Sequence, residues 1–379
     1  MQKCQDCYST TFGSYSEMLN YHQEQEQNSQ WIRCKVSDLS VEPLDKSSAN
    51  YFNPGVFASD ISEESIRDTA DHLGLAIKVN GELYPVRETA YKSLLDRAKI
   101  GGSALPKLKR DTLANVLNEC LHLYSSDALL LFRDEKVSAV HSGDESDYSI
   151  LPIDELLKTL SEKLDVRFSG YKFVEGYADH SVVSGLWKMP DQAEDLLGTY
   201  AKTLAAQGKG ALASRLIPGV RFMTSDTGVA SAKVSALLLG GQYPIHIGGC
   251  ISVDHRHQKT VSDFRDELDQ LFAQFGDNIA KLQGLMQVYL NYPVNAMTRI
   301  CKKLSLPKKA ALEAILMFEL SYGGGIATAH DVFIAMQEII FTLKSENVPE
   351  SKLLAVEENM ARALTLRWSD FDLAKAVDY

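Results

Sequence analysis

The sequence lacks the segments that would direct a chain into a membrane or a secretory route. No run of about 18 apolar residues is present, so no membrane-spanning helix is expected. The opening MQKCQDCYSTTFGSY has no basic region followed by an apolar core, which a secretory signal requires. Only six cysteines are scattered over 379 residues, which is typical of a reducing cytosol rather than of a disulfide framework. We therefore expect a cytoplasmic protein that does not contact a membrane.

Signatures of nucleotide and covalent chemistry are also missing. The sequence contains no phosphate-binding loop, dinucleotide fingerprint, nucleophile elbow or kinase motif. Its glycine triplet at 323–325 is not followed by Lys-Ser or Lys-Thr. Nucleotide hydrolysis is thereby disfavoured, no cofactor is expected, and an enzymatic role is the less favoured interpretation.

Positive charge is scarce overall but is concentrated in two places. The chain carries 39 Lys and Arg against 50 Asp and Glu, and this net charge of -11 argues against a protein that coats nucleic acid with its whole surface. Residues 87–110 nevertheless hold seven cations and two anions, whereas residues 299–309 hold five cations and no anion. A solvated helix face is the alternative interpretation of each run. The candidate nucleic-acid contacts are Arg97, Lys99, Lys107, Lys109 and Arg110 in the first run and Arg299, Lys302, Lys303, Lys308 and Lys309 in the second.

Strand patterns are clearest in residues 215–262, where apolar residues alternate with small or polar ones and glycines interrupt them. Two hairpins are predicted upstream. One spans 75–84 around Asn80-Gly81, a pair that suits a tight turn, and the other spans 128–140 around a charged turn. Apolar residues at helical spacing predict helices near 88–98, 113–124 and 153–164, and almost everything after 262 has this spacing too.

These patterns predict an α+β fold with a central, mostly antiparallel sheet, flanking helices and a C-terminal helical bundle. We expect three parts: a polar N-terminal arm at 1–60, an α+β domain with the central sheet at 61–262, and a helical region at 263–379.

Two groups in the strand-rich stretch could carry chemistry. Asp226-Thr227-Gly228 matches the tripeptide of aspartic proteases, but it occurs once, so a homodimer would be needed, and a hairpin turn is the simpler interpretation. His255 and His257 alternate along an expected strand and would face the same side, as two metal ligands can. No third ligand stands at a diagnostic spacing, so no metal site is assigned.

Two further motifs have a functional and a structural interpretation. Cys4 and Cys7 have the spacing of half a zinc knuckle, but the second pair is absent. Residues 299–315 have the cadence of a helix-turn-helix, with a turn at 305–307 and lysines opening the second helix. The alternative for that segment is an ordinary corner of a helical bundle.

The order of elements resembles a family of phage- and plasmid-related proteins, the domain of unknown function number 932. The resemblance covers roughly residues 60–370 and is carried by 142–157 and 225–228, although acidic residues are inserted before Tyr148. The quoted segments are TAYKSLLDRAKIGGSALPKL, KVSAVHSGDESDYSILPIDELLKTL and VRFMTSDTGVASAKVSALLL. The family implies a mobile-element context and supplies no catalytic residues.

The first functional hypothesis is a nucleic-acid-binding protein of phage or plasmid DNA replication or recombination. Tyr91, Phe222 and Tyr243 are candidate stacking groups, which makes single-stranded DNA a candidate partner. The second hypothesis is a homo-oligomeric phage assembly protein or an inhibitor of host defence, since glycine-rich strands can pair across subunits. The third is an aspartic or metal-dependent hydrolase that uses Asp226 or the two histidines.

Overall fold

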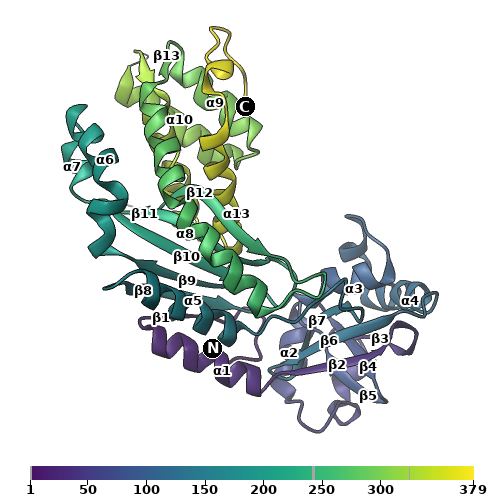
Figure 1. The fold of residues 1–379 in the computed structure, drawn as a ribbon. Coiled ribbons are helices and arrows are strands. Elements are labelled where there is room, and N and C mark those ends of the chain that lie inside the picture. The colour runs from purple at the N-terminus through teal and green to yellow at the C-terminus, as the bar shows by residue number, and fades with distance from the viewer. Residues whose placement is uncertain (1, 241–243, 324) are drawn as a thin grey trace.

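A six-stranded antiparallel sheet forms the centre of the molecule (Figure 1). The computed structural model describes residues 2–240, 244–323 and 325–379. The strand order is β1-β8-β9-β10-β11-β12, and all neighbours are antiparallel. The last three strands confirm the paired strands expected within 215–262. The strands are β1 (Ser9–Phe12), β8 (Lys172–Asp179), β9 (Val183–Lys188), β10 (Ile217–Thr224), β11 (Ala232–Leu239) and β12 (Ile245–Val253).

Helices pack on both faces of this sheet because its side chains alternate in direction. On β10, Phe222 contacts Phe264 of α8 on one face, with ring centroids 6.1 Å apart, whereas Arg221 pairs with Glu357 of α13 on the other. The helices α1 (Tyr15–Gln27), α5 (Ile153–Arg167), α6 (Ala193–Ala206) and α8 (Val261–Gly284) lie along the first face, and the four-residue α7 (Gly210–Ala213) follows α6.

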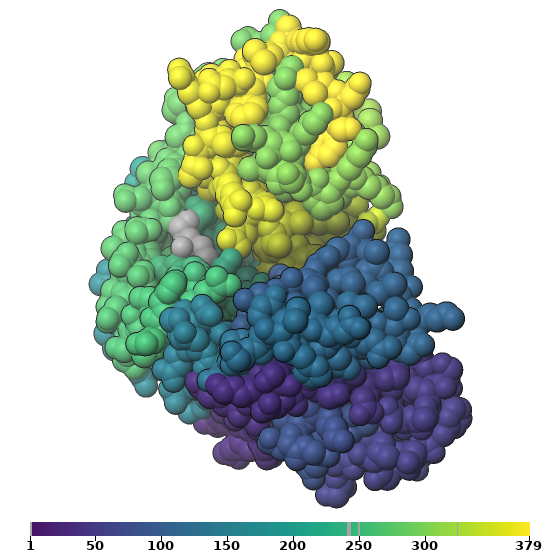
Figure 2. Space-filling view, turned by 90° about the vertical axis from the view of Figure 1, so that its right-hand side faces the viewer, coloured from purple at the N-terminus to yellow at the C-terminus, as the bar shows by residue number. Residues whose placement is uncertain are grey.

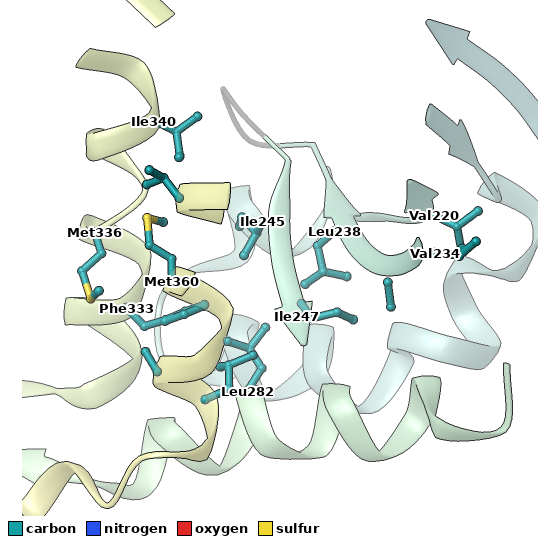
Figure 3. Packing of buried hydrophobic residues seen from close by; sticks show 14 of the residues in the cluster. Val220, Val234, Leu238, Ile245, Ile247, Leu282, Phe333, Met336, Ile340 and Met360 are labelled. Carbon is teal, nitrogen blue, oxygen red and sulfur yellow. The ribbon is translucent and has the colours of Figure 1, made fainter. Parts of the chain in front are cut away.

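The C-terminal helices form the expected bundle above the sheet. They are α9 (Pro293–Lys303), α10 (Lys308–Tyr322), α11 (Ala329–Ala335), α12 (Glu338–Ser345) and α13 (Glu350–Ala361), joined by the short pair β13 (Tyr289–Leu290) and β14 (Ala327–Thr328). Figure 3 shows Phe333 and Met360 of the bundle on the side that faces Ile245 and Ile247 of β12, with Met336 behind them, and all five belong to one hydrophobic cluster. The bundle and the sheet therefore share one hydrophobic core.

A second core lies in an N-terminal body built from two three-stranded sheets. Their orders are β2-β6-β7 and β3-β4-β5. The core contains leucines from two helices and two strands, with Leu75, Leu94, Leu117 and Leu130 all fully buried. The elements are β2 (Gln30–Lys35), β3 (Ser40–Pro43), β4 (Leu75–Val79), β5 (Glu82–Pro85), β6 (Asp127–Arg133), β7 (Lys136–Ser142), α2 (Glu63–Asp71), α3 (Ala90–Ala98) and α4 (Arg110–Leu121).

Both predicted hairpins are confirmed, as are the helices expected near 88–98 and 113–124. β4 and β5 are joined by Asn80 and Gly81, whose φ angles of 53° and 92° match the turn expected for this pair. β6 and β7 are joined by Asp134 and Glu135, which also have positive φ angles, 49° and 66°. The α+β class is likewise confirmed.

The expected polar arm at 1–60 is not an arm. Its residues form β1, which pairs with β8 of the large sheet, and β2, which pairs with β6 of the N-terminal body. Met18 of α1 is fully buried in the core of the large sheet. The expected domain 61–262 also spans parts of two cores rather than one, because the second core collects residues between Val36 and Val140. No helix among the described residues is long and apolar enough to cross a bilayer.

Candidate nucleic-acid interface

A polar cavity of about 290 Å³ lies where the N-terminal body meets the large sheet. The N-terminal body contributes α3 and the end of β7, and the large sheet contributes the β10–β11 turn and the segment after β12. The ionisable residues that line it are Lys92, Asp96, Arg97, His141, Asp147, Tyr148, Asp254, His255 and Arg256.

Three stacked rings form one wall of this cavity. Tyr148 stacks on His141 with ring centroids 3.6 Å apart and planes within 6°, and its other side faces His255 at 5.5 Å. The Tyr148 hydroxyl donates to the backbone oxygen of Asp226 over 2.9 Å, and the Nε2 of His141 lies 2.7 Å from the same oxygen. These contacts join the loop after β7 to the β10–β11 turn, so the wall is rigid.

Both histidines of the wall are neutral. Burial lowers the pKa of His141 to about 4, and it also lowers the pKa of His255. Because a carbonyl only accepts, Nε2 of His141 carries the hydrogen and Nδ1 is an acceptor. By the same reasoning Nδ1 of His255 donates to the oxygen of Ser149, 3.2 Å away, and its Nε2 accepts from the Thr224 hydroxyl.

The rim of the cavity carries three cations and three carboxylates. Two of the carboxylates accept hydrogen bonds from neighbouring hydroxyls: Asp147 from Ser142 over 3.1 Å and Asp254 from Ser231 over 2.6 Å. Arg97 is half-buried, its Nε has no hydrogen-bond partner among the described residues, and burial lowers its pKa. A buried donor without an acceptor costs free energy, and more so on a charged group. Binding of a ligand acceptor by the Arg97 Nε would therefore be favourable.

The other cations of the first predicted group follow Arg97 in the segment between α3 and α4 and at the start of α4. Lys107 and Lys109 are exposed, the ammonium of Lys99 lies 4.3 Å from the centre of the Tyr124 ring, and Arg110 donates to the backbone oxygen of Pro106. Within residues 2–240, 244–323 and 325–379, none of these side chains forms an ion pair, and neither do Arg97 and the nearby Lys92. We call Lys92, Arg97, Lys99, Lys107, Lys109 and Arg110 the α3–α4 cations.

Most cations of the second predicted group, in residues 299–309, already have hydrogen-bond or ion-pair partners. Arg299 donates to the backbone oxygen of Lys375 over 2.6 Å, Lys302 donates to that of Asp378, and Lys309 pairs with Glu346. Lys303 and Lys308 are exposed. The predicted sequence of helix, turn and helix is confirmed, as α9 and α10. This arrangement occurs both in DNA-binding helix-turn-helix motifs and in ordinary corners of helical bundles.

The two groups do not form one surface. α3 and α4 belong to the N-terminal body, whereas α9 and α10 pack within the C-terminal bundle at the other end of the molecule (Figure 1). Figure 2 gives the same arrangement from the side, with the blue N-terminal body below the green and yellow bundle. A single groove lined by both groups, which would be expected of a shared phosphate path, is therefore not present.

Asp226 has a structural environment. Its carboxylate pairs with Arg133 over 2.8 Å and is buried, while the turn itself is held by the Ser225 hydroxyl, which accepts from the backbone of Thr227 and Val229. The turn interpretation is confirmed, with Arg133 rather than Asp226's own backbone as the partner of the carboxylate. A carboxylate held by a guanidinium lacks the partner carboxyl that an aspartic protease needs to share a proton.

The expected histidine pair is wrong in its geometry. β12 ends at Val253, so His255 and His257 lie beyond the strand, and His255 is buried while His257 is exposed with a φ of 60°. Neither belongs to a potential metal site. In the part of the chain that the structure describes, one group has three close ligand atoms, Asp6, Asp68 and His72, and the Lys136 ammonium bonds both carboxylates there.

The proposed stacking groups are not available as expected. Phe222 is fully buried, and the hydroxyl of the half-buried Tyr91 is enclosed. Tyr243 lies outside the described residues. The sequence reasoning missed Tyr148, His141 and the three carboxylates as one site, because they come from separate segments that only the tertiary fold brings together.

Comparison of the chain with protein-family models, with curated proteins and with solved structures finds no match.

Proposed function

We propose that the chain binds nucleic acid through the α3–α4 cations, as a protein of phage or plasmid DNA metabolism. The observation that carries this proposal is the absence of ion pairs on these six cations, within the described residues, on a chain with a net charge of -11. Between Lys92 and Arg110 the single acidic residue is Asp96, so the local charge is six minus one, or +5. Such a segment attracts phosphates and releases their counterions on binding.

The polar cavity beside the α3–α4 cations favours single-stranded over double-stranded nucleic acid. Its three carboxylates repel phosphate, but they accept hydrogen bonds from the exocyclic amino groups of cytosine, adenine and guanine. Nδ1 of His141 is a further acceptor. In a duplex these base edges are paired or recessed, whereas a single strand can turn one base into the cleft while its phosphates follow the α3–α4 cations. Arg97 belongs to both surfaces and would bind the phosphate at the point where the base enters.

Replacing Lys107, Lys109 and Arg110 together by Ala is expected to weaken binding of a labelled mixed-sequence single strand by about tenfold or more, uniformly across sequences. Loss of three phosphate contacts should also reduce the slope of log affinity against log salt by about 2. Fluorescence anisotropy at several salt concentrations measures both quantities. The Arg97→Ala variant should combine a smaller loss of affinity with a smaller single-strand preference.

The second cation group offers the matched control. Lys302, Lys303 and Lys308 carry the same total charge but lie in the bundle, so their joint replacement by Ala should leave affinity within about twofold of the parent. Absence of any binding by the parent at low salt would exclude the proposal. Equal losses in the two triple variants would show that only overall charge matters and that the α3–α4 cations are not a site.

A further inference from the structure

The solvent side of α10 is apolar. Leu312, Leu316 and Leu320 follow one another at four-residue spacing and are 44%, 56% and 74% exposed. This spacing places them in one continuous ridge along the helix. Met317, Tyr322 and Ile326 extend the exposed apolar surface.

This ridge is not needed to hold α10 in the bundle. The opposite side of the helix supplies the core contacts, through Ala310, Ala314, Ile315 and Phe318, all of which are buried. Other exposed apolar side chains of the same size, such as Leu123 and Val166, are isolated in sequence. An unbroken exposed ridge marks an interaction surface, because monomeric proteins seldom leave such surface in water.

We propose that this ridge binds the same ridge of a second copy, with the two α10 helices crossing antiparallel at Leu316. Ridges of residues four apart fit into the matching grooves of an identical helix, so the surface is complementary to itself. A two-fold axis through Leu316 places Leu312 of one copy near Leu320 of the other and closes the assembly at two copies.

Charge favours the antiparallel arrangement. The start of α10 carries Lys308 beside Lys309, which pairs with Glu346, while its last turns carry Glu319 and the carbonyl oxygens at the C-terminal end of the helix. An antiparallel crossing brings the lysines of one copy toward the negative end of the other α10. Elsewhere two chains of charge -11 repel each other, so this apolar surface with one basic end is a favourable place for two copies to meet.

The contact is small, which predicts a reversible dimer. If Leu312, Leu316, Leu320 and Met317 each lose about 80 Å² in contact, two copies bury roughly 640 Å², which is less than the ~1,000 Å² of a stable specific interface. We therefore expect a weak dimer in exchange with the monomer, whose fraction rises with protein concentration. This inference is independent of the proposed nucleic-acid binding, since α10 lies away from α3 and α4.

Sedimentation velocity of the parent should give a mass that rises with concentration from 42.0 kDa toward twice that value. Leu316→Glu should hold the protein at the monomer mass and raise the dimer dissociation constant at least about tenfold, since a charge would be buried at the axis. Val166→Glu is the matched control, because Val166 is 88% exposed on α5, and it should dimerise like the parent. Circular dichroism verifies that each variant is folded.

Cross-linking tests the geometry separately. Leu316→Cys should form a disulfide-linked dimer under mild oxidation, because the two copies of this position meet at the axis, while Leu123→Cys should not. A parent that stays monomeric at all concentrations would overturn the proposal. So would a Leu316→Glu variant that dimerises normally, or a Leu316→Cys variant that cross-links no better than Leu123→Cys.

Discussion

Mild acid is expected to unfold the protein cooperatively, with a midpoint at about pH 5. Six of the nine histidines have a pKa that burial lowers. The pKa falls to about 3 for His22, His180 and His246, and to about 4 for His141 and His330, while that of His255 is lowered as well. These rings remain neutral in the fold at pH values where they would be protonated in the unfolded chain.

The sign of the effect follows from proton uptake. The folded pKa lies below the unfolded value of about 6.5, so the stability that a neutral ring contributes is complete above that pH and is lost as the pH falls toward the folded pKa. Once its unfolded form is protonated, each ring lowers the free energy of unfolding by up to about 1.4 kcal/mol for every unit that the pH falls. Six such rings together lower it by about 8 kcal/mol per unit. The free energy of unfolding of a typical domain is roughly 5–15 kcal/mol, so a fall of about one to two pH units is enough to unfold the protein.

Urea unfolding at a series of pH values between about 7.5 and 5 measures this slope and gives the number of protons taken up. His22→Leu should lower that number by close to one, because the buried Nε2 of His22 has no partner in the described structure and an apolar side chain can replace it. Replacing His257, which is exposed, by Gln is the control. Uptake of fewer than about two protons, or a midpoint below about pH 4, would contradict this account.

The local parts of the fold were readable from the sequence because single residues impose them. Asn80 and Gly81 accept positive φ angles, and so fix the β4–β5 turn whatever surrounds it. Such features depend on neighbours within about four positions, and the sequence displays them directly.

The long-range parts were not readable. In β1 Ser9 pairs with Asp179, and in β2 Gln30 pairs with Phe132. Both strands have exposed positions, so neither shows the apolar pattern by which a strand is recognised in a sequence. An edge strand needs one buried side and open hydrogen-bonding groups, which a polar segment can supply. Residues 1–60 therefore have the composition of an arm but form the edge strands of three sheets, β1, β2 and β3.

The candidate site was readable in part. Arg97 and the cations after it are recognisable in the sequence as an excess of positive charge, and among the residues that the structure describes none of them forms an ion pair. Asp226 and His255 stood out too, but for chemistry that their burial and partners do not support. The cleft itself needs the end of β7 beside the end of β12, and no pattern within either segment specifies that contact.

Replacing Lys136 by Met is expected to destabilise the protein by about 3–5 kcal/mol, the largest effect of any single change argued from these contacts. Lys136 is fully buried, and its ammonium lies 2.8 Å from a carboxylate oxygen of Asp6 and also bonds Asp68. Asp6 is held further by Arg87, which is also fully buried, and by the backbone N–H of Glu88. Removing the ammonium leaves Asp68 without its cation and Asp6 with a distant one, 3.4 Å away.

This network is also what attaches the N-terminal segment to the rest of the protein. Asp6 comes from the first residues, Asp68 from α2 and Lys136 from β7, so three distant segments meet at one ammonium. Burial alone would raise the pKa of Asp68, but hydrogen bonds from Lys136 and from the backbone of Asp6 outweigh it and the pKa is lowered. The ion pair therefore contributes its full stability above the unfolded pKa of about 4 and loses it as the pH falls from there toward the lowered folded pKa, so its removal is best measured at pH 7 to 8.

Thermal and urea unfolding of three variants separate the network from a surface effect. Lys136→Met should show the full loss, and adding Asp68→Asn to it should restore about 1 kcal/mol or more, because the uncompensated charge is removed. Lys3→Met is the control in the same N-terminal segment. Its partner Glu24 is 60% exposed at 3.1 Å, and a solvated pair of this kind contributes less than about 1 kcal/mol. A Lys136→Met variant that is destabilised no more than Lys3→Met would show that the buried ammonium is replaceable and that the N-terminal segment is held by its β1 and β2 pairings instead.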